Sequence, residues 1–456
     1  MFDPADQGSR EPGPARRFVG SVRGLAARRA GLDPSLLALI YEGFLSRLSF
    51  GILSFALPLY ALELGLGLSA IGFLLSLNLM VALALKPLSG ALADRIGLKL
   101  TLTVAISLRS VVSLLLAFAA VPWQLFATRS LHGVSIALRD PPVNALIAEQ
   151  ASAGRVASSF AWYQTAKSVA GSLGKVAAGL LIAITAGDYS LVFAAGFVLS
   201  IAPLYVVIHR VSEPERHVVS TGAAAAAPSD AHAERVHDNR DAADRPSPAK
   251  QPGLARFTGA GFMISGAGYM LSALFPVLAV EYAGLSAAQA GLLYSVSALF
   301  ALAGPLFGWL SDNVSRRLVL QLRSVANVGS SLIFWLAPSF AGFAAGKAID
   351  DLGKAAFRPA WGALMAEVSG YDRARRARAM GYMSAGEDAG EMAGPILAGF
   401  LWSTWGAPVL FAVRIGWALA AEIYTTAISG ALYRGHRGDS PTRCPSRVGM
   451  SEKAGG

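Results

Sequence analysis

The chain has 456 residues, of which 54% are hydrophobic and only 15% are charged, and its formal net charge is +10. Because a soluble domain carries about 25% charged residues, this composition excludes an ordinary soluble protein. The basic residues gather in segments between apolar runs, which argues against a nucleic-acid-binding protein. With a single cysteine, Cys444, the chain cannot form an intramolecular disulfide.

Apolar runs of about 20 residues recur along the chain, and a run of that length crosses a hydrocarbon core of about 30 Å. They lack the strict alternation of barrel strands, so we predict an all-α membrane protein with twelve transmembrane helices. The predicted spans cover residues 36–61, 69–89, 100–120, 123–147, 157–185, 189–209, 256–282, 287–307, 318–337, 340–367, 379–403 and 407–432.

A polar stretch between two spans returns later in the chain. Gly90-Ala-Leu-Ala-Asp94-Arg95-Ile-Gly97-Leu-Lys99 is matched by Gly308-Trp-Leu-Ser-Asp312-Asn-Val-Ser315-Arg316-Arg317, 218 positions further on. Arg129 and Lys347 are separated by the same offset. We therefore predict two pseudo-symmetric six-helix bundles related by a parallel repeat, with each polar stretch forming a turn.

The predicted organisation has five parts. They are an N-terminal segment 1–35, a first bundle 36–209, a linker 210–254, a second bundle 255–432 and a tail 433–456. The linker mixes charges, alanines and prolines and cannot bury enough apolar surface to fold, so we expect it to be disordered. The start of the chain has no apolar signal-peptide core, so we expect no cleaved signal.

Basic residues in the short loops set the orientation. Arginines and lysines occupy every second loop, as in 95–99, 316–317 and 373–378, whereas the alternate loops contain none. The positive-inside rule then places both termini and the linker in the cytoplasm. We expect a multi-pass protein of the cell inner membrane, in contact with the lipid bilayer and monomeric.

The first polar stretch resembles the loop 2–3 signature of the major facilitator superfamily of secondary transporters. That signature, Gly-x-x-x-Asp-Arg-x-Gly-x-Lys, is formed here by Gly90, Asp94, Arg95, Gly97 and Lys99. The second copy is looser and contributes Gly308, Asp312, Arg316 and Arg317. The resemblance implies that both loops brace the cytoplasmic helix ends and bias the inward- and outward-facing states. The alternative is that the basic residues only fix topology.

Two spans carry charged stripes. Arg129-Ser-Leu-His132-Gly133 resembles a second motif of the family, Arg-x-x-Gln-Gly, with histidine in place of glutamine, and Asp140 falls near the same helical face. The other stripe consists of Lys347, Asp350, Asp351, Lys354 and Arg358. A charge at the bilayer centre costs about 2.5–3.5 kcal/mol or more, so these side chains must face partners or water. The resemblance implies that both helices line a central cavity; the alternative is salt bridges that only hold the bundle together.

Glu42 lies in the first span and has no obvious partner nearby in the sequence. Burial of an unpaired carboxylate disfavours its charged form, which suits a proton carrier. Several multidrug antiporters of the family carry an acid in this helix, and Glu42 resembles it. The alternative is a carboxylate that reaches the cytoplasmic interface.

The fifth and eleventh spans carry opposite charges on matching faces. Lys167 and Lys175 are basic, whereas Glu387 and Glu391 are acidic. These faces are expected to bridge at the interface of the two bundles. Drug antiporters of the family usually have a Gly-Pro pair in the fifth helix, where this chain has Gly174-Lys175, so the direction of transport stays open.

We find no metal-ligand spacing, phosphate-binding loop or catalytic triad, so we expect no metal, no cofactor and no enzymatic activity. The prediction is a secondary transporter that moves a small organic solute by alternating access, coupled to protons, with efflux favoured over uptake. The alternatives are a symporter or facilitator that imports a solute, and a non-transporting sensor or assembly protein on a degenerate transporter frame.

Overall fold

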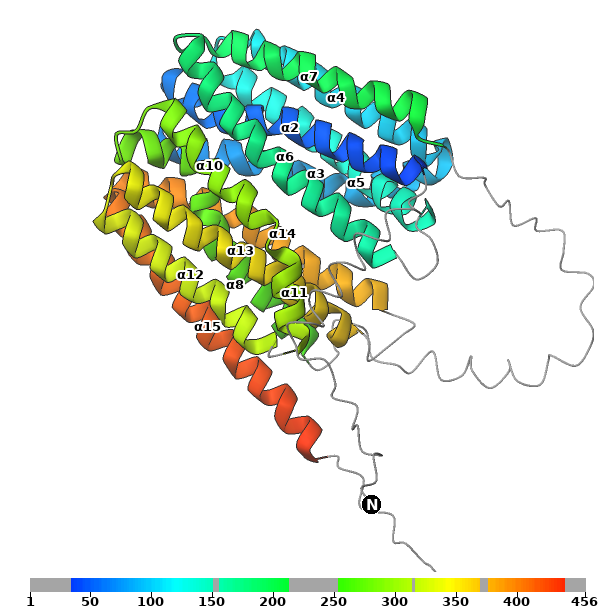
Figure 1. Ribbon diagram of the computed structural model, residues 1–456, viewed down its shortest axis with the longest axis vertical. Coiled ribbons are helices and arrows are strands. Elements are labelled where there is room, and N and C mark those ends of the chain that lie inside the picture. The colour runs from blue at the N-terminus through cyan, green and yellow to red at the C-terminus, as the bar shows by residue number, and fades with distance from the viewer. Residues whose placement is uncertain (1–33, 151–155, 213–252, 314–315, 370–375, 439–456) are drawn as a thin grey trace, which may run out of the picture. The chain divides into compact units, whose positions relative to one another are not determined.

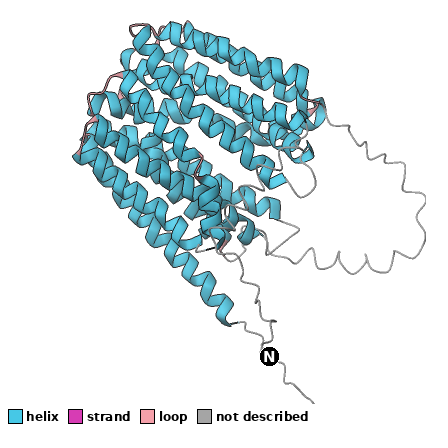
Figure 2. Cartoon of the chain, in the orientation of Figure 1, coloured by secondary structure: helices cyan, strands magenta, loops and turns pink. Residues whose placement is uncertain are grey.

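The computed structural model describes residues 34–150, 156–212, 253–313, 316–369 and 376–438. In this part of the chain all regular structure is helical, and short turns join the helices (Figures 1 and 2). The first half contains α2 (Pro34–Glu63), α3 (Leu68–Ile96), α4 (Leu98–Ala117), α5 (Pro122–Gln150), α6 (Val156–Ile184) and α7 (Tyr189–Arg210). The second contains α8 (Leu254–Ser272), α9 (Phe275–Val277), the π-helix η3 (Leu278–Tyr282), α10 (Ala287–Ala301), α11 (Gly304–Asn313), α12 (Arg316–Leu336), α13 (Phe340–Ser369), α14 (Arg376–Trp405) and α15 (Ala407–Gly438).

Each predicted span corresponds to a helix, and two spans are broken. The span at 256–282 is divided into α8, α9 and η3, with a bend of 40° after Ser272. The span at 287–307 is divided into α10 and α11. Pro276 and Pro305 lie at these breaks, each in the first turn of the helix that follows. Proline has no backbone N–H, and it is tolerated in a first turn because the N–H groups there have no partner within the helix.

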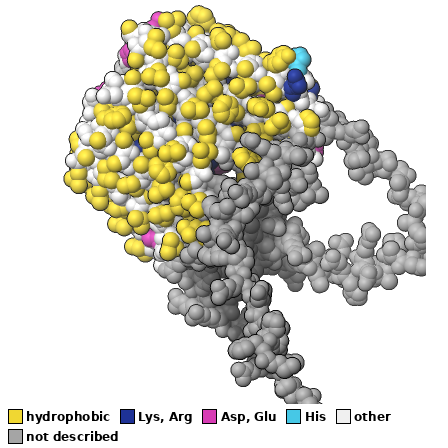
Figure 3. All heavy atoms as spheres, viewed as in Figure 1, with side chains coloured by type: hydrophobic (Ala, Val, Ile, Leu, Met, Phe, Trp, Pro, Cys, Tyr) yellow, Lys and Arg dark blue, Asp and Glu magenta, His cyan; other side chains and the backbone are white. Residues whose placement is uncertain are grey.

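The helices have the composition of membrane spans. Seven described helices are long and apolar enough to cross a membrane, and the bent pair formed by α8 with α9 and η3 makes up to eight. On the face shown in Figure 3, hydrophobic side chains cover most of the described surface, and charged ones form only a few spots. Phe118, Ile184 and Leu336 are among the large apolar side chains that point outward, as lipid-facing residues do.

The helices form two compact units. The first contains α2 to α7 together with η3 and α10, and the second contains α8 and α11 to α15. In the first unit, α2 packs on α6 and α7, α5 packs on α3 and α4, and α10 packs on α6. In the second unit, α8 packs on α14, and α12 packs on α13 and α15. The predicted bundle boundaries at 209 and 255 stay predictions, and most of the linker 210–254 lies outside the described residues.

The apolar core of each unit lies between these helices. In the first unit, Leu39, Ile106 and Leu146 join α2, α4 and α5. In the second, Phe257, Trp361 and Met383 join α8, α13 and α14. Some polar and charged side chains of the spans, such as Glu42 and Asp350, are buried between the same helices.

The turn between α3 and α4 is shorter than predicted. The sequence predicted a polar turn over 90–99, but α3 continues to Ile96 and α4 begins at Leu98. Gly97 alone makes the turn, with φ 104° and ψ 150°. Its N–H donates to Ala93 and its carbonyl accepts from Thr101, so hydrogen bonding continues across the turn. The signature residues 90–96 therefore belong to the last turns of a helix.

Replacing Gly97 should destabilise the protein. A side chain at this φ and ψ costs about 1–3 kcal/mol, so Gly97→Ala should lower the unfolding temperature of the detergent-purified protein. Gly362→Ala in α13 is the matched control, because a Cβ there meets nothing within 4 Å. Equal unfolding temperatures for the two variants would contradict the conformation assigned to Gly97.

Candidate functional site

A buried ion pair joins three helices of the first unit. Glu42 of α2 is 0% exposed. Nη2 of Arg139, on α5, donates to the two carboxylate oxygens of Glu42 at 2.9 and 2.8 Å and to the hydroxyl of Tyr163, on α6, at 2.9 Å. Both charges are thus neutralised inside the helix bundle, where an isolated charge is expensive.

This geometry excludes the alternative in which Glu42 reaches the interface, because the carboxylate is fully buried. It is paired with Arg139, which lies 97 residues later in the sequence. Arg139 was not among the residues that the sequence analysis singled out. A role of Glu42 as proton carrier stays a prediction.

A second group of polar side chains surrounds His132 on α5. The imidazole is 2% exposed and stacks on Phe50 of α2, with ring centroids 4.8 Å apart and planes within 4°. Neither ring nitrogen has a hydrogen-bond partner in the described part of the chain. Arg109 of α4 lies over the same Phe50 ring, and its Nη1 donates to Ser46 Oγ at 2.5 Å.

The other predicted residues of the first unit lie around these groups. Arg129 donates to the main-chain carbonyls of Leu74 and Leu75 on α3, at 3.4 and 3.2 Å. Asp140 is half-buried on α5. Lys167 lies over the ring of Tyr163, 4.9 Å from its centroid.

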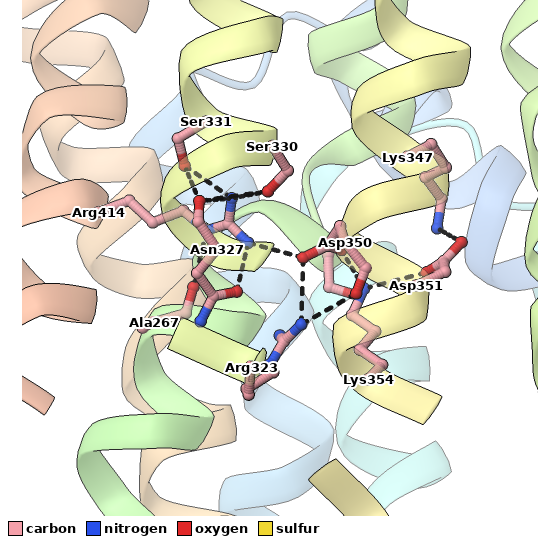
Figure 4. Close-up of polar contacts among 11 residues, drawn as sticks. Ala267, Arg323, Asn327, Ser330, Ser331, Lys347, Asp350, Asp351, Lys354 and Arg414 are labelled. Carbon is pink, nitrogen blue, oxygen red and sulfur yellow. Dashed lines mark hydrogen bonds and ion pairs between the residues drawn. The ribbon is translucent and has the colours of Figure 1, made fainter. Parts of the chain in front are cut away.

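The second unit contains a larger ion network, centred on Asp350 of α13 (Figure 4). Its carboxylate accepts from Arg414 Nη2 of α15 at 2.8 Å, from Lys354 Nζ at 2.6 Å and from Arg323 Nη1 of α12 at 3.3 Å. Asp351 extends the network and pairs with Lys347 Nζ at 2.5 Å. Three helices are therefore held together by opposite charges.

Arg414 is fully buried and uses every nitrogen of its guanidinium group. Besides Asp350, it donates to the main-chain carbonyl of Ala267 on α8 and to both oxygens of Asn327 on α12. It also donates to the hydroxyls of Ser330 and Ser331 (Figure 4). Complete pairing is what a buried guanidinium requires.

The predicted stripe on α13 thus forms internal salt bridges with α12 and α15, which is the structural alternative left open by the sequence. Arg358, the last member of the predicted stripe, is exposed and is not part of the network in Figure 4. A role of this stripe in lining a cavity stays a prediction.

The gating signatures are described only in part. Arg95 is exposed at the end of α3, and Lys99 Nζ donates to the Ile208 carbonyl near the end of α7 at 2.9 Å. That contact joins the start of α4 to the end of α7, and the gating role of the signature stays a prediction. The surroundings of the other signature positions lie outside what the structure describes; these are Gly90, Asp94, Gly308, Asp312, Arg316 and Arg317.

The predicted bridges between the fifth and eleventh spans stay predictions, because those helices belong to different units. Within the first unit, Lys175 of α6 lies over the ring of Tyr294 of α10, 4.4 Å from its centroid. Within the second, Glu387 and Glu391 are half-buried on α14.

Sequence reasoning missed several members of these networks. They are Arg109, Tyr163, Arg323, Asn327 and Arg414. The arginines were detectable, because each is an isolated charge in an otherwise apolar run, which marks a functional or structural site in a membrane span. Their partners come from other helices and leave no spacing pattern. In the described part of the chain no three His, Cys, Asp or Glu side chains form a group that could hold a metal ion.

Comparison with known proteins identifies a transporter family and similar transport proteins. The sequence model of the Major Facilitator Superfamily matches residues 43–237 and 257–443. Quinolone resistance protein NorA of Staphylococcus aureus (strain MRSA252) is 28% identical over 131 residues, which are 29% of this chain and 34% of that protein. A gallate transporter of Pseudomonas putida is 34% identical over 114 residues, 25% of this chain and 24% of that protein. The chain thus spans about a third or less of the length of these relatives.

Solved structures share the fold. The nucleoside transporter NupG has a TM-score of 0.66 at 15% identity, covering 86% of this chain and 99% of that chain. A bacterial homologue of the human lysosomal transporter Spinster, inward-facing and unoccupied, has a TM-score of 0.64 at 14% identity, covering 94% and 98%.

Removing the centre of the second network should destabilise the protein strongly. Asp350→Asn leaves Arg323, Lys354 and Arg414 without their shared carboxylate, and breaking a buried pair costs about 3–5 kcal/mol. The unfolding temperature of the purified protein should fall, whereas Arg358→Gln, on the same helix but exposed, should leave it unchanged. Similar values for both variants would show that the network contributes little.

Proposed function

We propose that this chain, which belongs to the major facilitator superfamily of secondary transporters and has its fold of twelve helices in two pseudo-symmetric six-helix bundles, exports a small organic solute in exchange for protons. The observation that carries the proposal is the pair of Glu42 and Arg139. It puts an acid that can bind a proton inside the bundle, in contact with an arginine from another helix.

The pair offers a simple means of coupling. While Glu42 is ionised, it holds Arg139 of α5, which also donates to Tyr163 of α6. A proton on the carboxylate removes the charge that fixes the guanidinium, so α2, α5 and α6 are held together less firmly. Proton binding would then favour a different arrangement of these helices, and that is the requirement for coupling.

The two signature loops complete the proposed cycle. Lys99 links α4 to the end of α7, and a contact of this kind can stabilise one arrangement of the helix ends over another. We assign the same bracing role to Asp94, Arg95, Asp312, Arg316 and Arg317, on the resemblance of their motifs. Both termini are proposed to lie in the cytoplasm, and the protein to act as a monomer in the inner membrane.

Uptake is the second candidate, because the comparisons lend export only limited support and one feature of the sequence departs from the drug-antiporter pattern. The part of the chain that resembles the quinolone resistance protein is no longer than 29% of its length, and a similar share resembles the gallate transporter. In addition, α6 has Gly174-Lys175 where drug antiporters of the family have Gly-Pro. A symporter that uses the same Glu42–Arg139 pair would carry the solute and the proton in the same direction.

A flux assay with an imposed proton gradient tests the proposal. Proteoliposomes with purified protein should move a solute, found by screening, against its gradient when protons flow the other way. In Glu42→Gln the flux should lose its dependence on the pH gradient, because the side chain no longer binds a proton.

Glu149→Gln, an exposed acid at the end of α5, is the control and should keep the pH dependence. If Glu42→Gln responds to the gradient like the unmodified protein, Glu42 is not the proton carrier. Solute that moves with the protons would replace export with uptake.

A further inference from the structure

The two units differ in how they neutralise the buried charges of α5 and α13. The repeat offset of 218 positions pairs Arg129 with Lys347 and His132 with Asp350. In the second unit the carboxylate of Asp350 collects three cationic side chains. In the first unit a histidine occupies that position, and it supplies no negative charge.

Arg109 and Arg129 form no ion pair with an acid among the described residues. Arg109 has Ser46 Oγ and the face of Phe50 as its partners, and its Nε has no hydrogen-bond partner among the described residues. Arg129 donates only to main-chain carbonyls. Of the two acids in this part of the bundle, Glu42 is engaged by Arg139, and Asp140 is half-buried on α5.

His132 itself is unsatisfied in the same place. Both ring nitrogens are buried without a hydrogen-bond partner in the described part of the chain, and such orphaned groups are rare because each costs desolvation energy. His132 and Arg109 both lie against the ring of Phe50, so a cation is close to the imidazole. A neutral imidazole still has one N–H to donate.

We propose that Arg109, Ser46 and His132, between α2, α4 and α5, bind the carboxylate of an organic anion, and that this anion is the transported solute. The inference rests on the proposed transport function and names its substrate class. The incoming carboxylate supplies the charge that Asp350 supplies in the second unit. It accepts charge-assisted hydrogen bonds from Arg109 and one from the His132 ring.

The direct test compares acids with their uncharged counterparts. Benzoate, gallate and hexanoate are added to the full-length purified protein, each beside its carboxamide, and the unfolding temperature is measured. At least one acid should raise it, and its amide should not. Chloride, sulfate and phosphate at equal ionic strength test for a general anion effect. The inference falls if no acid stabilises the protein, if the amides act equally, or if the inorganic anions alone match the acids.

Variants locate the effect. Arg109→Gln should weaken binding of the stabilising acid about tenfold or more, because hydrogen bonds to charged groups are the stronger class. Arg210→Gln removes one exposed positive charge at the end of α7 and should leave the affinity unchanged. Equal affinities in the two variants would place the anion elsewhere.

His132→Asp gives a test that needs no ligand. It puts a carboxylate at the position equivalent to Asp350, so the ligand-free protein should unfold at a higher temperature than His132→Asn, and the acid should no longer stabilise it. Retained stabilisation by the acid would overturn the inference.

The two proposals fail in different ways. Proton-driven flux of neutral or cationic solutes, with no binding of any acid, would leave the transporter standing and remove the carboxylate site. Binding of an acid that is abolished by Arg109→Gln, without flux of any solute, would keep the site but refute the transport function.

Discussion

The spans can carry charges only if those charges meet partners inside the bundle. Hydrocarbon offers no solvation, so a buried carboxylate, ammonium or guanidinium needs opposite charges or hydrogen-bond partners within the protein. In the first unit Glu42 and Arg139 join α2 to α5. In the second, Asp350 gathers side chains from α12, α13 and α15. These contacts fix which helix faces turn inward.

The repeated frame is preserved while its chemistry has diverged. In the first unit Ser49 of α2 donates to the carbonyl of Gly196 on α7. At the positions 218 residues later, Arg414 of α15 donates to the carbonyl of Ala267 on α8. The same pairs of positions are thus in contact in both units, but the donor has moved to the other helix and become an arginine. The first unit therefore holds the Glu42–Arg139 pair, whereas the second holds the larger network around Asp350.

The sequence predicted the helices well, because span length and apolar composition follow from the thickness of the bilayer. It also identified Asp350, Asp351 and Lys347 as a buried stripe, because residues three or four apart share a helical face. It did not predict that Arg139 holds Glu42, since 97 positions separate them and only the fold brings them together. The partners of Asp350 on α12 and α15 were missed for the same reason.

The central claim, that buried charges are held by partners inside the bundle, is tested most directly by a double-mutant cycle on Glu42 and Arg139. Arg139→Gln alone should lower the unfolding temperature sharply, because it leaves a carboxylate unpaired inside the bundle. Adding Glu42→Gln should recover much of that loss, since no charge then remains. A double variant whose loss equals the sum of the two single losses would contradict the account.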